Sequence, residues 1–272
     1  MRRLFRKSKG WGPTLAAAMI LPIAPHLCFA QGASPMSFEV ASVRPQPFVG
    51  SSGSVGIFVR GNTLHAEHAS LYDLVLYAYN LRDVQLSGGP SWARSGVLQS
   101  SELYQVIAKT SGDTPPEADV LRQMLQTLLA DRFKLQVHRV QKDLPVYNLV
   151  VNKSGPKLKE SSADTKSILR VSSSGRLGVR VVASHTTMQQ LIDRQLDNYT
   201  DRLIFDKTGL TAPYDFTLDF AVENGPPGQE PGSNDPPALV TAVQEQLGLK
   251  LEPAKAPVDT VVIDHAEKPS EN

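Results

Sequence analysis

The stretches Ser70-Leu-Tyr-Asp-Leu-Val-Leu-Tyr-Ala-Tyr79 and Thr187-Met-Gln-Gln-Leu-Ile-Asp-Arg-Gln-Leu196 decide the predicted fold, because they follow one pattern 117 residues apart. Each opens with a hydroxyl residue that can cap a helix, and Asp73 or Gln190 stands three residues later, as in a capping box. Apolar residues then recur at helical spacing and form one face. Both stretches are therefore predicted to be amphipathic helices that pack on a core.

Two further pairs of segments repeat at similar intervals. Tyr104-Gln-Val-Ile107 is matched by Tyr214-Asp-Phe-Thr217, and Phe133-Lys-Leu135 by Leu249-Lys-Leu251. Similar spacing is what an internal duplication leaves. We predict an α+β fold of two pseudo-repeated β-β-α-β-α-β-β halves, with helices packed on mostly antiparallel sheets.

Turn signals place the strands within this plan. A hairpin over residues 55–65 is predicted to turn at Gly61-Asn62, and one over 168–183 at Ser174-Gly175. Each half is predicted to end in two strands, with residues 141–145 joining the first pair. Residues 223–237 are dense in Pro and Gly and are predicted to form a loop. The expected organisation is residues 31–160 for the first half and 161–272 for the second.

Residues 1–30 have the pattern of a secretory signal peptide. Five basic residues precede an apolar run from Trp11 to Leu27, and Cys28-Phe-Ala30 places small residues at a cleavage site after Ala30. A membrane anchor is the alternative, but prolines interrupt the run and it is shorter than the roughly 20 residues of a spanning helix. A lipoprotein anchored at Cys28 is a second alternative, although Leu27 is larger than such a site prefers. We expect a periplasmic or secreted protein without a membrane span after cleavage.

Removal of those 30 residues changes the charge and cysteine content. They contain five of the 28 basic residues, none of the 27 acidic residues and the single cysteine. The remaining chain is mildly acidic, which argues against a nucleic-acid partner. It also has no thiol for a disulfide, a metal or a nucleophile.

His65, Glu67 and His68 form the densest group of metal-binding residue types. Metalloproteases place two histidines four residues apart on a helix, whereas these two are three apart on a predicted strand. Residues three apart on a strand point to opposite faces. His65 and His68 are kept as metal candidates, and we expect neither a metal nor another cofactor.

Three histidines are candidates for acid–base chemistry in an alternative enzymatic interpretation. Asp264 and His265 could act as orienting acid and base, and His68 or His185 could act beside a carboxylate. A hydrolase would also need a nucleophile, and the sequence has no G-x-S-x-G elbow. Phosphate-binding glycine loops are absent as well.

Several strings resemble a known family. They are FEVASVRP, LLADRFKLQVHR, LPVYNLVV, YDFTLDF and VIDHAEKPSEN. Together they are similar to a secreted domain of unknown function that is expanded in soil Acidobacteria and is sometimes fused to sensor-type membrane peptidases. The resemblance implies export and many paralogues, and it implies no catalytic residues.

One segment near the C-terminus has a second resemblance. AVQEQLGLKLEPAKAPVDTVVI is similar to the short N-terminal module of secretins and TonB-dependent receptors, which mediates periplasmic contacts. The favoured hypothesis is a non-enzymatic binding or interaction module of the cell envelope, whose partner is an envelope protein or a small ligand. The alternative is a secreted hydrolase that uses a histidine–carboxylate pair.

Overall fold

The two capping stretches form the predicted helices. The computed structural model describes residues 36–46, 56–94, 102–114, 116–162, 164–174, 178–222 and 236–269. Helix α1 (Leu71–Tyr79) begins after Ser70, and helix α3 (Met188–Arg194) begins after Thr187. In each helix the cap side chain accepts a hydrogen bond from the third backbone N–H, and the third side chain accepts one from the cap N–H. Both capping boxes are thus confirmed.

The described residues form four α-helices and twelve strands, which is the predicted α+β class. The other two helices are α2 (Ala118–Arg132) and α4 (Leu239–Leu247). Short 3-10 helices are η1 (Asp83–Gln85), η2 (Ser91–Ala93) and η3 (Leu196–Tyr199). The strands are β1 (Val40–Pro45), β2 (Gly56–Arg60), β3 (Thr63–Ala69), β4 (Leu86–Gly88), β5 (Tyr104–Lys109), β6 (Gln136–Val151), β7 (Lys159–Glu160), β8 (Ile168–Ser174), β9 (Gly178–Thr186), β10 (Leu203–Asp206), β11 (Tyr214–Ala221) and β12 (Leu249–His265).

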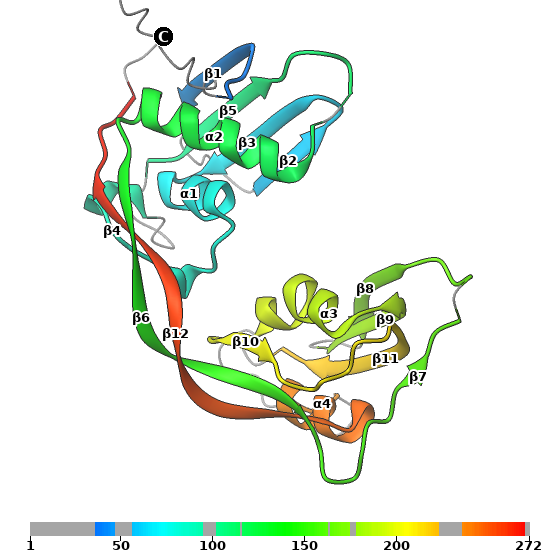
Figure 1. Ribbon diagram of the computed structural model, residues 1–272. Helices are drawn as coiled ribbons and strands as arrows, with labels where there is room; N and C mark the ends of the chain where they lie inside the picture. Colours follow the sequence, from blue (N-terminus) through cyan, green and yellow to red (C-terminus); the bar gives the residue numbers. More distant parts are fainter. Residues whose placement is uncertain are drawn as a thin grey trace, which may run out of the picture. The chain divides into compact units, whose positions relative to one another are not determined.

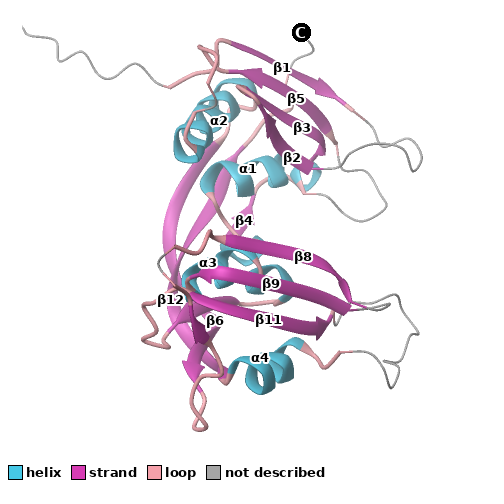
Figure 2. Cartoon of the chain, turned by 90° about the vertical axis from the view of Figure 1, so that its right-hand side faces the viewer, coloured by secondary structure: helices cyan, strands magenta, loops and turns pink. Residues whose placement is uncertain are grey.

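The strands form three four-stranded sheets, ordered β1-β5-β3-β2, β10-β6-β12-β4 and β7-β11-β9-β8. All pairs are antiparallel except β10 with β6 and β4 with β12. Helices α1 and α2 lie on one face of the first sheet (Figure 2). The predicted hairpin turn at Gly61-Asn62 joins β2 to β3 and is confirmed.

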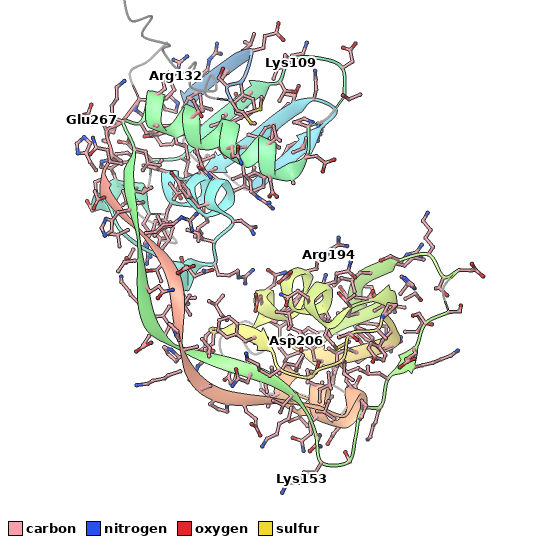
Figure 3. All side chains as sticks on the ribbon, in the orientation of Figure 1. Lys109, Arg132, Lys153, Arg194, Asp206 and Glu267 are labelled. Atoms are coloured by element: carbon pink, nitrogen blue, oxygen red, sulfur yellow. The ribbon has the colours of Figure 1, made fainter. Side chains whose placement is uncertain are left out.

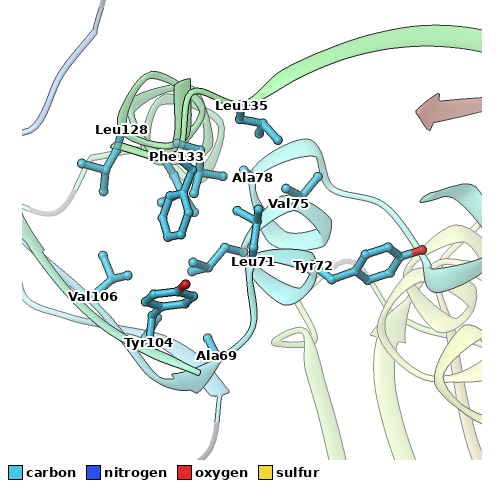
Figure 4. Packing of buried hydrophobic residues seen from close by; sticks show 14 of the residues in the cluster. Ala69, Leu71, Tyr72, Val75, Ala78, Tyr104, Val106, Leu128, Phe133 and Leu135 are labelled. Carbon is cyan, nitrogen blue, oxygen red and sulfur yellow. The ribbon is translucent and has the colours of Figure 1, made fainter. Parts of the chain in front are cut away.

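One hydrophobic cluster, here called the first core, lies under α1 and α2. The rings of Tyr104 and Phe133 meet edge to face with centroids 5.1 Å apart, and both side chains are almost fully buried. Figure 4 shows Leu71 and Val75 beside them, whereas Tyr72 points away. The Tyr72 hydroxyl donates to Leu86 O, and the Arg94 guanidinium lies 4.2 Å from its ring centroid.

A second core lies between the β7-β11-β9-β8 sheet and helices α3 and α4. Its side chains include Met188, Leu191, Phe220 and Val243, all essentially inaccessible to solvent. Gly248 ends α4 in the left-handed conformation with φ 66°, which is typical of a glycine directly after the last turn of a helix.

The expected pair of strands at the end of each half is wrong. Residues 136–151 form the single strand β6 and residues 249–265 the single strand β12, and the two pair along their length (Figure 1). Pro145, which belongs to the predicted connection over residues 141–145, and Pro257 both lie within the ladder. Among the described strands, none pairs with β6 at Pro145 or with β12 at Pro257 as a third strand, so the missing N–H of each proline costs no hydrogen bond to such a strand.

The β6–β12 ribbon connects the two cores. Leu149 of β6 lies in the second core, although it precedes residue 160, and Val261 and Ile263 of β12 lie in the first core. Each core is therefore completed by a strand from the other half of the sequence. The division into domains at residue 160 remains a prediction.

The order of elements is the same from β1 to β6 as from β7 to β12: three strands, a helix, two strands, a helix and a long strand. An ancestral duplication would produce this order, but the duplication itself remains a prediction. The expected signal peptide, Cys28 and most of the 223–237 loop lie outside the described residues.

None of the helices in the described ranges is both long and apolar enough to span a membrane.

Candidate functional site

His68 and His185 occupy matching backbone positions at the ends of β3 and β9. Both adopt the left-handed conformation, with φ 50° and 47°. The strand register shifts beside each, between Ala66 and Ala69 in β3 and between Tyr214 and Phe216 opposite β9. Histidine is one of the few side chains enriched at positive φ. The two histidines are therefore explained as bulge residues that turn each strand into its helix cap.

The backbone N–H of each histidine is held by side-chain oxygens. The His68 N–H donates to Gln46 Oε1 at 2.9 Å. The His185 N–H donates to Ser161 Oγ at 3.0 Å and to Asp215 Oδ1 at 2.9 Å. The Ser161 hydroxyl also donates to Asp215, and these two bonds lower the pKa of the Asp215 carboxyl.

The group around His185 contains the residue types of a catalytic triad without its connections. The serine proton goes directly to the carboxylate, and His185 Nδ1 is buried with no hydrogen-bond partner in the described part of the chain. A triad needs the imidazole between the hydroxyl and the carboxylate. This arrangement ties β7 to the bulge of β9 and assembles no activated nucleophile.

His65 lies apart from any set of metal ligands. Its ring stacks on Phe58, with centroids 5.4 Å apart and planes inclined by 10°, and the Arg60 guanidinium lies 4.8 Å from the Phe58 centroid. Within the described ranges, no three His, Cys, Asp or Glu side chains are grouped so that they could hold a metal ion.

Asp264 and His265, which were expected to pair with each other, each contact a different residue. Asp264 contacts His138 Nδ1 at 2.9 Å, and His265 Nε2 contacts Glu267 at 3.0 Å. These side chains are roughly half exposed. Asp264 and His265 therefore do not form the expected acid–base pair, and no hydroxyl of the described residues contacts either histidine ring.

A cleft of about 1180 Å³, here called the central cleft, lies among the described residues. Its walls come from α1 and the loop that follows it, from α3 and η3, from β10 and from the middle of β12. None of the sequence candidates lines it except His68.

The lining of the central cleft contains both apolar and polar side chains, and its polar members are here together called the rim. Ile204 of β10 points into the second core, so its neighbours Leu203 and Phe205 point to the opposite face of the strand, and both line the cleft half-buried. Leu76 and Leu81 add apolar surface from the other wall. The rim carries amides and charges: Asn80, Gln85, Gln141, Gln189, Asp193 and Arg194.

Arg82 joins the two walls of the central cleft. Its Nη1 donates to Asn198 Oδ1 at 2.6 Å, and its Nη2 donates to the backbone oxygen of Asp197. Gln85 Nε2 donates to Asp259 O at 3.0 Å and ties the same loop to β12. All three hydrogen bonds join residues more than 100 positions apart.

Asp197 is the most perturbed acid of the cleft. It is 9% exposed, and its carboxylate accepts a hydrogen bond from Ile204 N–H at 3.2 Å. Burial raises the pKa of this carboxyl to about 6, against the opposing effects of Arg82 and the Ile204 N–H. Sequence reasoning missed both Arg82 and Asp197, because neither belongs to a local motif.

Comparison with known proteins gives a family without a known activity. A family model described as "Protein of unknown function (DUF3738)" matches residues 72–266, which is more than half of the chain. No curated protein and no solved structure matches significantly. These findings contain nothing that tests the expected export, the link to Acidobacteria or the resemblance to secretin and TonB modules.

Proposed function

Because the chain belongs to the DUF3738 family of proteins of unknown function, its role must be argued from its own residues, and we propose that it is a ligand-binding module of the cell envelope. The central cleft is the proposed binding site. Its ligand would have an apolar portion to cover Leu203 and Phe205 and polar groups to meet the rim. Segments of envelope proteins and amphipathic small molecules both have this chemistry.

The anatomy of the central cleft is the observation that carries this proposal. Ligand sites typically measure about 300–1,000 Å³ and combine apolar walls with a few convergent polar groups. A volume of about 1180 Å³ is slightly above that range. It suits a short extended segment better than a small metabolite.

Placement in the envelope rests on the N-terminal sequence. Basic residues followed by an apolar run and Cys28-Phe-Ala30 support export by the secretory pathway. The remaining chain lacks cysteine and so needs no reducing compartment.

The hydrolase alternative requires a histidine ring that touches both a carboxylate and a nucleophile. In the described ranges, the backbone N–H of His185 donates to a hydroxyl and to a carboxylate, but its ring does not contact them. The ring of His138 contacts the carboxylate of Asp264 and no hydroxyl of the described residues. Binding therefore accounts for more of the observed geometry than hydrolysis does.

A cleft-filling substitution tests the proposal. Envelope extract is separated into peptide, glycan and small-molecule fractions, and each is added to the chain from Gln31 onward while its Tm is measured. A ligand at a hundred times its Kd stabilises by about 2.7 kcal/mol and raises Tm by several degrees. We expect one fraction to do so for the wild type and for Val171→Trp but not for Leu203→Trp.

The two variants are matched in chemistry and differ in place. Val171 is 45% exposed on β8 and does not line the central cleft, whereas Leu203 does. If no fraction separates the two variants, the central cleft is not a binding site.

A further inference from the structure

We propose that the end of the central cleft between Arg82 and Arg194 is an anion subsite, which binds an oxyanion of the ligand in place of Asn198. This inference rests on the proposed function, because it names a chemical group that the ligand of the cleft must carry. The shared chemistry is that of a carboxylate or a phosphate.

Arg82 is held in the cleft without a negative partner. Its two guanidinium nitrogens bind neutral oxygens, the Asn198 side-chain amide and the Asp197 main chain. No acidic side chain of the described residues lies within ion-pair distance of it. A guanidinium that is bound to neutral oxygens keeps its full charge and its bidentate geometry for an anion.

Arg194 supplies the second positive charge from the opposite wall. It is the last residue of α3, is exposed and lines the same cleft (Figure 3). Asn198 connects the two arginines, because its Nδ2 donates to Arg194 O at 3.0 Å while its Oδ1 accepts from Arg82. An oxyanion that displaced the Asn198 amide would meet the Arg82 guanidinium directly, and Arg194 would add its positive charge from the lining of the same cleft.

The neighbouring acids are occupied with other donors. Asp197 accepts from Ile204 N–H of β10, and Asp193 of α3 accepts from Gln189 Nε2 at 2.6 Å. Charged side chains that act on Asp197 are Arg82 from the loop after α1 and Asp193 from α3, while β10 contributes only a backbone donor. Since burial raises the pKa of Asp197, this carboxyl loses its charge in mildly acidic solution and then opposes an anion less.

Arg122 provides the matched control within the same cleft. It lines the central cleft, but its Nη1 pairs with Asp119 at 2.6 Å. Its charge is already compensated, so its removal should leave anion binding unchanged.

Sulfate is the probe, because its charge is constant between pH 5 and pH 8. Sulfate titrations followed by amide chemical shifts would give Kd for the wild type, Arg82→Gln, Arg194→Gln and Arg122→Gln, with Tm measured for each variant. We expect Arg82→Gln and Arg194→Gln each to weaken binding about fivefold to tenfold, as the loss of a charge-assisted hydrogen bond does. Arg122→Gln should change Kd by less than about twofold.

A pH series separates a built site from general attraction to positive charge. Wild-type affinity for sulfate should rise about threefold from pH 7.5 to pH 5 as Asp197 becomes neutral, and Asp197→Asn should abolish the change. Methyl phosphate and acetate, compared at pH 7.5, identify which oxyanion the subsite prefers.

The inference is overturned if all three arginine variants bind sulfate like the wild type, or if all three weaken it equally. The Arg194 side chain donates no hydrogen bond to the described residues, and its main-chain oxygen keeps the bond from Asn198 after substitution, so Arg194→Gln remains informative if Arg82→Gln unfolds. A ligand fraction that stabilises the chain and is insensitive to Arg82→Gln and Arg194→Gln would leave the proposed function standing and remove the subsite alone.

Discussion

The region around the first core and the region around the second core share one plan and differ in detail. Both have a capping box at the start of the first helix, a left-handed histidine two residues before the cap, and a side-chain oxygen that holds the histidine N–H. They differ in the loops that follow the first helices, where Arg82 stands in one and Asp197 in the other.

This difference separates architecture from function. His68 and His185 recur at the same place in both regions, so a structural role explains both at once. Arg82 and Asp197 have no such counterparts, and they meet at the central cleft. Features that occur in only one region are therefore the better candidates for binding.

The largest expected effect concerns Gly248, which ends helix α4 near the second core. A Cβ on Gly248 would lie 2.3 Å from Gly155 O and 2.8 Å from Lys157 N, at a φ of 66°. Gly248→Ala should cost roughly 3 kcal/mol, the sum of a left-handed penalty and overpacking. The free energy of unfolding in urea measures it.

Gly61 is the matched control for that substitution. Its φ is 58°, but an added Cβ would have nothing within 4 Å. Gly61→Ala should cost about 1 kcal/mol, the backbone penalty alone. Equal losses in the two variants would show that the close approach at Gly248 is unimportant.

The next effect concerns Asp197, whose carboxyl has no counterpart near the first core. Its folded pKa of about 6 exceeds the ordinary value of about 3.9, so the folded state holds this proton more tightly than the unfolded state does. The stabilisation from this tighter proton binding is fully present below pH 4 and is lost as pH rises through 6. The loss in the free energy of unfolding is on the order of 2 kcal/mol.

Asp197→Asn should remove this decrease in stability with rising pH, because asparagine does not ionise, and its side-chain oxygen can still accept from Ile204 N–H. The variant is expected to be more stable than the wild type at pH 7.5 and no more stable at pH 4. Urea unfolding across this pH range is the measurement, and parallel pH profiles for the two proteins would contradict the assignment.

A smaller effect is expected at the two left-handed histidines. Alanine at His68 or His185 should cost about 1 kcal/mol relative to glycine, because glycine alone adopts positive φ without a steric penalty. His68→Gly and His185→Gly should stay within about 0.5 kcal/mol of the wild type. If alanine proved as stable as glycine at both sites, the bulge explanation would fail.

The smallest effect is a gain in stability at Lys134, which lies between α2 and β6. Lys134 has a φ of 50°. Lys134→Gly should raise the free energy of unfolding by about 0.5 kcal/mol, since relief of strain exceeds the added entropy of the unfolded chain. Thermal unfolding measures it, with the exposed Lys153→Gly as the control that should not gain.

Local signals in the sequence were enough to predict much of the fold. The capping boxes at Ser70 and Thr187, the turn at Gly61-Asn62 and the stop at Gly248 each depend on a few adjacent residues. Helix caps and tight turns are decided by hydrogen bonds over three or four positions, so a single sequence contains them.

Long-range pairing explains what the sequence did not reveal. Pro145 is ordinarily a turn residue, and only its place in a ladder with Lys255 makes it part of a strand. The contact of Arg82 with Asp197 and Asn198 joins positions more than a hundred residues apart and follows no spacing rule. The central cleft, which depends on such contacts, was therefore not predictable.

The central claim is that each core is completed by a strand from the other half, so the two regions must unfold together. Trp92 packs against the first core, and a tryptophan in place of Tyr199, in a Trp92→Phe background, would report on the second. Urea unfolding of the chain from Gln31 onward should give the same midpoint for both probes. Two separate midpoints would show that the cores are independent and that the β6–β12 ribbon does not couple them.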